Sequence, residues 1–110
     1  MQKFMVLYQA PSTAMQEWMK KPESERKEAE QKMKDEWGAW MKAHPMVLNT
    51  IAVGKAKRVT KGNVADASND IMISSYVEAE SPEAAAALFT DHPHFGIPGA
   101  TIEVMPIRPM

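Results

Sequence analysis

The sequence predicts one α+β domain over residues 1–110, in which a four-stranded antiparallel sheet is covered by helices on one face. Three observations predict this fold class. Apolar residues alternate over short segments, as in strands, and recur every three or four residues over longer segments, as in helices. These segments follow the order strand, helix, strand, strand, helix, strand. A length of 110 residues is also close to the commonest size of a single domain.

The first strand is predicted from Lys3 to Gln9, and Pro11 ends it. Its apolar residues lie on both faces, which is typical of a central strand that is covered on both sides. Thr13 and Gln16 fit a capping box, in which each side chain bonds the backbone N–H group of the other residue. They predict a short helix that ends before Pro22.

The clearest helix is predicted from Glu23 to Ala43, and Pro45 stops it. Acidic residues cluster in its first turn and Lys42 lies in its last turn, which is the arrangement that the helix dipole favours. We expect His44 to satisfy the C-terminus of this helix. The apolar stripe that should face the sheet consists of Ala29, Met33, Trp37, Trp40, Met41 and His44.

The second half of the chain begins with two more predicted strands. Val47–Val53 is the second strand, Lys55–Thr60 extends it as a more polar segment, and Ile71–Ala79 is the third strand. Between them we expect a turn at Lys61–Asn63 and an irregular segment at residues 64–69.

A second main helix and a closing strand complete the prediction. Ser81 is a suitable N-cap, and Pro82 suits the first helical position of a helix that runs to about Thr90. The fourth strand is predicted from Thr101 to Ile107. The residues that the second main helix should bury are Ala84, Ala85, Leu88 and Phe89.

This order of elements, with right-handed crossovers, gives a ferredoxin-like split βαβ arrangement (βαββαβ) with both main helices on one face of the sheet. The other face would then expose a contiguous apolar surface, formed by residues such as Met5 and Leu7 or by their opposite-face neighbours. Such a surface is larger than a soluble monomer normally exposes. We therefore predict a homodimer in which two copies pair their sheets face to face about a twofold axis.

Several segments match a known family in order along nearly the whole chain. They are Phe4–Tyr8, Trp37–Met41, Val77–Ser81 before the alanine-rich helix, Asp91–His94 and Thr101–Pro106. On these segments the chain resembles the YCII-related family of the dimeric α+β barrel superfamily. The resemblance implies a homodimeric barrel. It implies no single activity, because the superfamily includes monooxygenases, lactone isomerases and haem enzymes.

Two motifs found in that family are absent from this chain. Some short members carry a histidine early in the first long helix and an aspartate near its end, proposed as an acid/base pair. Here the early part is Glu23–Lys27, and Asp35 has no histidine nearby in sequence. Another branch carries Asp-Gly-Pro-Phe between the middle strands, where this chain has Lys61–Val64. Neither proposed site can be carried over.

The composition excludes several kinds of site. The chain has no cysteine, so it can form no disulfide, thiolate nucleophile or cysteine-ligated zinc site. A formal charge of -1 gives no field that favours nucleic acid or an anionic membrane surface. No stretch has the length or apolarity of a signal peptide or a membrane span. We therefore expect a soluble cytoplasmic protein that binds neither nucleic acid nor membrane.

The predicted topology brings chemically able residues to one rim of the sheet. There the first strand ends at Tyr8, the third begins after Asp70, and the loop Asp91–His94 follows the second main helix. His92 and His94 are the candidate catalytic residues, because histidine titrates near neutral pH and Asp70 or Asp91 could orient a ring. The alternative is that these histidines cap the end of the helix.

The same residues could serve other purposes. His92 and His94 with Asp70 or Asp91 could ligate iron, zinc or copper, but there is no clear third ligand, so we expect neither a metal nor a cofactor. The candidate ligand-binding residues are Tyr8, Trp40, Tyr76 and Asp91. Trp18, Trp37 and Trp40 could line a cavity for a planar ligand, or could fill the core between helix and sheet.

Two functions remain open at this point. The first is a small homodimeric protein that binds a small organic molecule beside the sheet, with an isomerase- or lyase-type proton transfer assisted by His92 or His94. The second is a non-catalytic dimeric sensor or accessory module. A polar, accessible cavity with a titrating histidine would favour the first function. A filled core with capped histidines would favour the second.

Overall fold

The computed structural model describes residues 1–110 and has an α+β architecture. Its strands are β1 (Gln2–Gln9), β2 (Val47–Ala52), β3 (Ala56–Thr60), β4 (Asn63–Ala67), β5 (Ile71–Ala79) and β6 (Thr101–Pro106). Its helices are α1 (Ser12–Met19), α2 (Glu23–Ala43), α3 (Pro82–Ala87) and the 3-10 helix η1 (Pro93–Gly96). This confirms the predicted α+β class.

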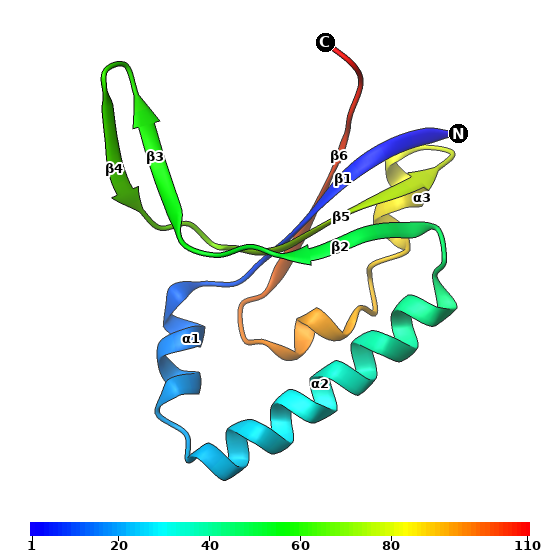
Figure 1. Ribbon diagram of the computed structural model, residues 1–110. Helices are drawn as coiled ribbons and strands as arrows, with labels where there is room; N and C mark the ends of the chain where they lie inside the picture. The colour runs from blue at the N-terminus through cyan, green and yellow to red at the C-terminus, as the bar shows by residue number, and fades with distance from the viewer.

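Four strands form an antiparallel sheet in the order β2-β5-β1-β6, with β1 and β5 at its centre. The helices α1 and α2 and the segment with η1 lie on one side of this sheet, with α2 running along it (Figure 1). The strand order and the pairing are compatible with the predicted ferredoxin-like arrangement. The bounds of α2 and β5 agree with the prediction at both ends.

The core lies between the sheet and α2, and the alternation of β1 explains why. Phe4, Val6 and Tyr8 point to the helical side and are fully buried. Burial of side chains of this size contributes about 1.5–3 kcal/mol each. The buried cluster as a whole consists of Phe4, Val6, Tyr8, Val47, Val77, Ala79, Ala85 and Phe89.

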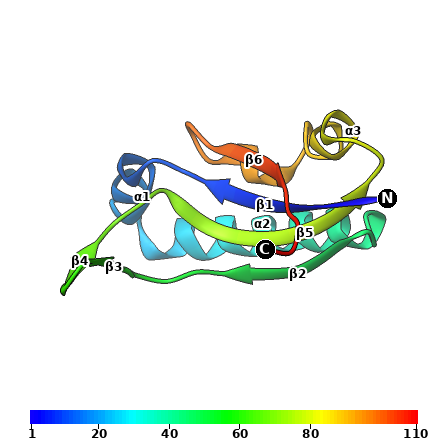
Figure 2. The same cartoon turned by 90° about the horizontal axis from the view of Figure 1, so that it is seen from above.

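No helix covers the other face of the sheet, and in the view from above only the C-terminal segment after β6 passes in front of it (Figure 2). Leu48, Ile51 and Met105 are exposed there, with exposed fractions of 46%, 58% and 38%. Met5 and Leu7 on β1 are half-buried on the same face. The predicted open apolar face is therefore present in the single chain, and we call it the open face.

Strands β3 and β4 form a separate two-stranded sheet that extends away from the body on the side opposite the helices (Figure 1). Gly62 in its turn has a φ of 78°, which glycine adopts at no steric cost. Two predictions were wrong here. The segment 55–60 does not extend β2 within the main sheet, and of the segment 64–69 only residues 68 and 69 are irregular, because Asn63–Ala67 pairs with β3.

Helix boundaries show two further corrections and one confirmation. The predicted capping box of Thr13 and Gln16 is wrong, because α1 starts two residues earlier, with Pro11 at its N-cap and no side-chain cap. Helix α3 ends at Ala87, three residues before the predicted end, and Ala84 is exposed. The predicted N-cap is confirmed, since the Ser81 hydroxyl accepts a hydrogen bond from the N–H group of Ala84 at 3.1 Å.

Candidate functional site

The backbone segments that were predicted to meet at one rim do so. The N–H group of Ala10 donates to the carbonyl of Asp70 at 2.9 Å, which joins the end of β1 to the start of β5. Gln9 pairs with Thr101 at the start of β6. His94 Nε2 lies 2.8 Å from the carbonyl oxygen of Gln9, so η1 is tied to the same rim.

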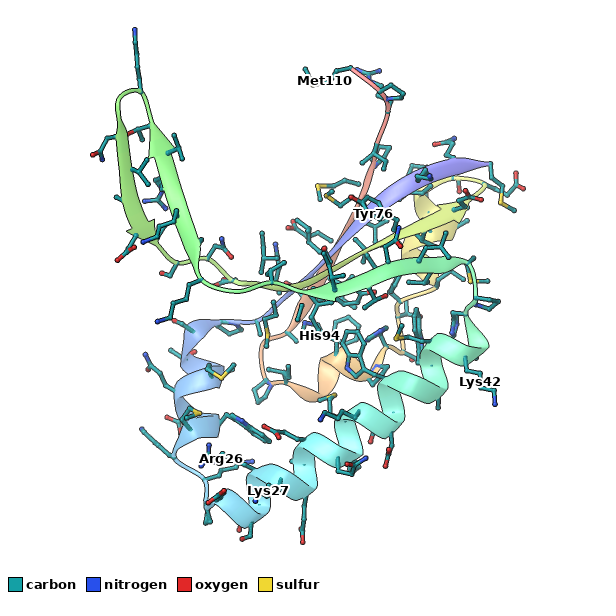
Figure 3. The ribbon with its side chains drawn as sticks, in the orientation of Figure 1. Arg26, Lys27, Lys42, Tyr76, His94 and Met110 are labelled. Atoms are coloured by element: carbon teal, nitrogen blue, oxygen red, sulfur yellow. The ribbon has the colours of Figure 1, made fainter.

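His94 lies on the helical side of the sheet (Figure 3), and His92 is buried with it inside the molecule. His92 and His94 are only 2% and 1% exposed. Aromatic side chains surround them, and together they form what we call the aromatic cluster. Its members are Tyr8 from β1, Trp37 and Trp40 from α2, Phe89 after α3, and His92 and His94 at η1.

Hydrogen bonds fix the proton position on each neutral imidazole. The backbone N–H group of His94 donates to His92 Nδ1 at 2.9 Å, so this nitrogen carries a lone pair and Nε2 carries the proton. In His94 the arrangement differs, because Nε2 must donate to the carbonyl of Gln9. The lone pair of His94 is therefore on Nδ1.

His92 Nε2 is a buried polar atom without a hydrogen-bond partner. It belongs to a ring that stands edge-on to Trp37, with centroids 4.4 Å apart, and to Trp40, with centroids 4.3 Å apart. An unpaired buried donor costs about 1–3 kcal/mol of stability. Two other buried side-chain atoms, Arg26 Nε and Thr50 Oγ1, also lack a partner, but His92 Nε2 is the one that belongs to the aromatic cluster. A buried donor of this kind calls for an explanation, and a bound acceptor group is one.

Burial also sets the ionisation of the cluster. It lowers the pKa of His92 from 6.5 to about 4, helped by the neighbouring His94 and His44. Burial lowers the pKa of His94 as well, although its bond to Gln9 acts in the opposite direction. Both rings are therefore neutral at pH 7. Burial raises the pKa of Tyr8, whose hydroxyl lies 2.8 Å from the Ser75 hydroxyl.

The candidate carboxylates take a different position from the histidines. Asp70 and Asp91 are exposed at the surface, and backbone groups rather than carboxylates orient the His92 and His94 rings. Asp70 contributes to the rim through its carbonyl oxygen. The histidines also do not cap the preceding helix through its carbonyls, because His92 accepts a bond and thereby caps the N-terminus of η1.

Three of the four ligand-binding candidates are divided between the two faces of the sheet, and the fourth, Asp91, is exposed in a loop. Tyr8 and Trp40 belong to the aromatic cluster, whereas Tyr76 lies on the open face (Figure 3). Trp40 also stacks on His44, with centroids 3.9 Å apart, and His44 Nδ1 lies 2.7 Å from the Trp40 carbonyl. This bond confirms that His44 satisfies the C-terminus of α2.

Sequence reasoning missed Ser75 as the partner of Tyr8. The signal was available, because Ser75 alternates with Ile73 and Val77 and must therefore point inward with them. Phe89 was predicted as core, and its contact with Trp40, at a centroid distance of 5.3 Å, places it in the cluster.

The structure shows no group of three or more histidine, aspartate or glutamate side chains placed to hold a metal ion. None of its helices is both long enough and apolar enough to cross a membrane. Comparison of the chain with protein-family models, with curated proteins and with solved structures finds no match.

Proposed function

We propose that this chain is a homodimeric, YCII-like protein that binds a small organic molecule in the aromatic cluster, with His92 Nε2–H as the hydrogen-bond donor. The observation that carries the proposal is the unpaired, buried Nε2 atom between Trp37 and Trp40. Binding sites for small molecules combine apolar and aromatic walls with a few polar groups that fix the orientation of the ligand. The cluster has this composition.

The chemistry of the cluster selects the ligand. The indole faces of Trp37 and Trp40 favour a planar or apolar body. The neutral His92 ring offers one N–H donor and no charge, so it favours an uncharged acceptor such as a carbonyl oxygen. The cluster is closed in this structure, and a ligand must displace Trp37 or Trp40.

Proton transfer is the catalytic form of this proposal. The neutral His92 ring would donate to the oxygen of a bound ketone, while the lone pair on His94 Nδ1 accepts a proton from the carbon beside the carbonyl. Return of that proton to another carbon would complete an isomerisation. The bond at His92 Nδ1 leaves the Nε2–H group of that ring as a donor. The bond at His94 Nε2 leaves the lone pair on Nδ1 of that ring as an acceptor.

The dimer is the second part of the proposal, and the open face supports it. Apolar residues on all four strands of the sheet, including Leu48, Met72 and Met105, lie on this face without a covering element. A second copy related by a twofold axis would cover all of them at once.

A pair of ligands of equal shape tests the binding site. In α-methylstyrene a methylene group replaces the carbonyl oxygen of acetophenone. The binding of each compound is measured by tryptophan fluorescence. We expect acetophenone to bind about 3- to 10-fold more tightly, as one net hydrogen bond implies. The variant His92→Asn removes the Nε2–H donor and should abolish this difference, whereas Tyr76→Phe on the open face should preserve it. Equal affinities in the unmodified protein would overturn the assignment of His92.

A non-catalytic dimeric sensor or accessory module is the second candidate function. The filled cluster favours it, because His92 and His94 are 2% and 1% exposed and each forms a bond to the backbone. Ligand binding without exchange of the protons next to the ketone of acetophenone in deuterated water would support this module over the isomerase.

A further inference from the structure

The hairpin of β3 and β4, residues 56–67, which we call the arm, has no packing partner in its own chain. Ten of its residues are exposed, and only Ala56 and Ala67 at its base are half-buried. Val59 and Val64 face each other across the two strands and are 73% and 64% exposed. An isolated two-stranded hairpin is at best marginally stable in water. The arm therefore needs a surface to pack against.

The open face has a groove at the end of the sheet away from the arm. Its volume is about 310 Å³, which is within the range of cavities that accept a ligand or a side-chain group. The arm follows the last residues of β2, whereas Leu48 near the start of β2 lines the groove. The lining residues are Lys3, Leu48, Asn49, Tyr76, Val77, Glu78 and Ile107.

The backbone is adapted locally at this groove. Asn49 has a φ of 55°, and it is the one residue other than glycine with a positive φ. The register between β2 and β5 shifts between Leu48 and Ile51, so the edge strand bulges here. Such outliers persist where the surrounding structure holds them in place. A groove opened by a bulge in an edge strand is suited to receive a protein segment.

We infer that the arm of one copy lies in the groove of a second copy, in a dimer that pairs the two open faces. This inference rests on the proposed homodimer and specifies how its arms are used. The arm and the open face are on the same side of the body (Figure 1). A twofold axis that crosses the strands would place the partner's arm above the groove, which the arm of the same chain cannot reach.

The dimensions agree with this arrangement. Each strand of the arm has 5 residues, so the arm is roughly 17 Å long, whereas two packed sheets are about 10 Å apart. The arm therefore extends past the interface and along the end of the partner sheet.

The interface area also favours use of the arms. Four strands of this length offer roughly 500 Å² per copy, or about 1,000 Å² in total, from strand rise and spacing. Stable interfaces commonly bury about 1,600 Å², so the sheet faces alone are too small. Two arms in two grooves would add several hundred Å², on the order of what is missing.

The surfaces match in chemistry as well. Val59 and Val64 form the apolar part of the arm, and Leu48, Tyr76 and Ile107 form that of the groove. On the face of the arm that carries the valines, nearer its base, Lys57 forms an ion pair with Asp66. This face therefore has little net charge. Lys61, in the turn of the arm, remains cationic and would lie near the groove's carboxylate, Glu78.

Disulfide trapping tests the arrangement without background, because the chain has no cysteine. The double variant Val59→Cys/Leu48→Cys places one thiol on the arm and one in the groove, at positions that are 73% and 46% exposed. After mild oxidation we expect a covalent dimer as the major species. The matched control is Val59→Cys/Ile51→Cys, which places the second thiol on the open face at the end of β2 nearest the arm, and it should remain largely uncrosslinked.

The outcomes separate this inference from the proposed dimer. If Val59→Cys/Ile51→Cys forms the covalent dimer and Val59→Cys/Leu48→Cys does not, the twofold axis does not cross the strands as inferred. The proposed dimer itself would still stand. A dimer in analytical ultracentrifugation that neither pair can crosslink would overturn the use of the arm. A monomeric unmodified protein would overturn both the arm contact and the proposed homodimer.

Discussion

The buried ring of His92 should make folding sensitive to acid in a defined pH interval. Burial lowers its pKa in the folded protein from 6.5 to about 4. Between these values the unfolded chain binds a proton that the folded protein does not bind, so the free energy of unfolding falls as the pH drops. Above pH 6.5 both states are neutral and this effect is absent.

Linkage gives the magnitude. For this difference in pKa, His92 alone lowers the free energy of unfolding by about 2 kcal/mol between pH 7 and pH 4.5. Urea unfolding at both pH values measures it. The matched variant is His92→Asn, whose amide oxygen can accept the bond from the backbone of His94 but does not titrate. Losses of stability that do not involve His92 are common to both proteins and cancel in the comparison.

The unmodified protein should therefore lose about 2 kcal/mol more than His92→Asn over this interval. Equal losses in the two proteins would refute the reasoning, because they would mean that His92 titrates in the folded state as it does in the unfolded chain. An imidazole resonance of His92 in the folded protein that titrates near pH 6.5 rather than near 4 would contradict it in the same way.

Three further substitutions test the packing around the site. Tyr8→Phe leaves the buried hydroxyl of Ser75 without its partner and should cost about 1–3 kcal/mol in urea unfolding. Gly99→Ala forces an unfavourable positive φ and places a Cβ atom 2.9 Å from Pro11 Cγ, so the melting temperature should fall by several degrees, as a loss of about 1–3 kcal/mol implies. Ser81→Ala removes the N-cap of α3 and should cost about 1 kcal/mol in the same unfolding assay. A change below about 0.5 kcal/mol, as for a neutral surface substitution, would contradict each assignment.

The main sheet and α2 were predictable because their signals are long and mutually consistent. In Glu23–Ala43 the apolar stripe and the residues that begin and end it predict the same helix. In Ile71–Ala79 the alternation and the flanking residues predict the same strand. Strand β4 was not predictable in the same way. Its sequence, Asn63–Ala67, has only one β-branched residue, and pairing with β3 alone keeps it extended.

The rim was predictable from topology, but the state of the histidines was not. The order of the strands is enough to bring Gln9, Asp70 and His94 together. Which ring nitrogen carries the proton depends on the path of the backbone at η1, since the His94 N–H group occupies His92 Nδ1. A carboxylate near in sequence, such as Asp91, is no guide, because its side chain points to solvent.

Native mass spectrometry of protein purified without chelators or added ligand tests the central claim most directly. It weighs the assembly together with any molecule it retains. The proposed function predicts twice the chain mass with a discrete small-molecule adduct. Twice the chain mass without an adduct would favour the non-catalytic module. A monomer without an adduct would contradict both the paired open faces and the ligand in the aromatic cluster.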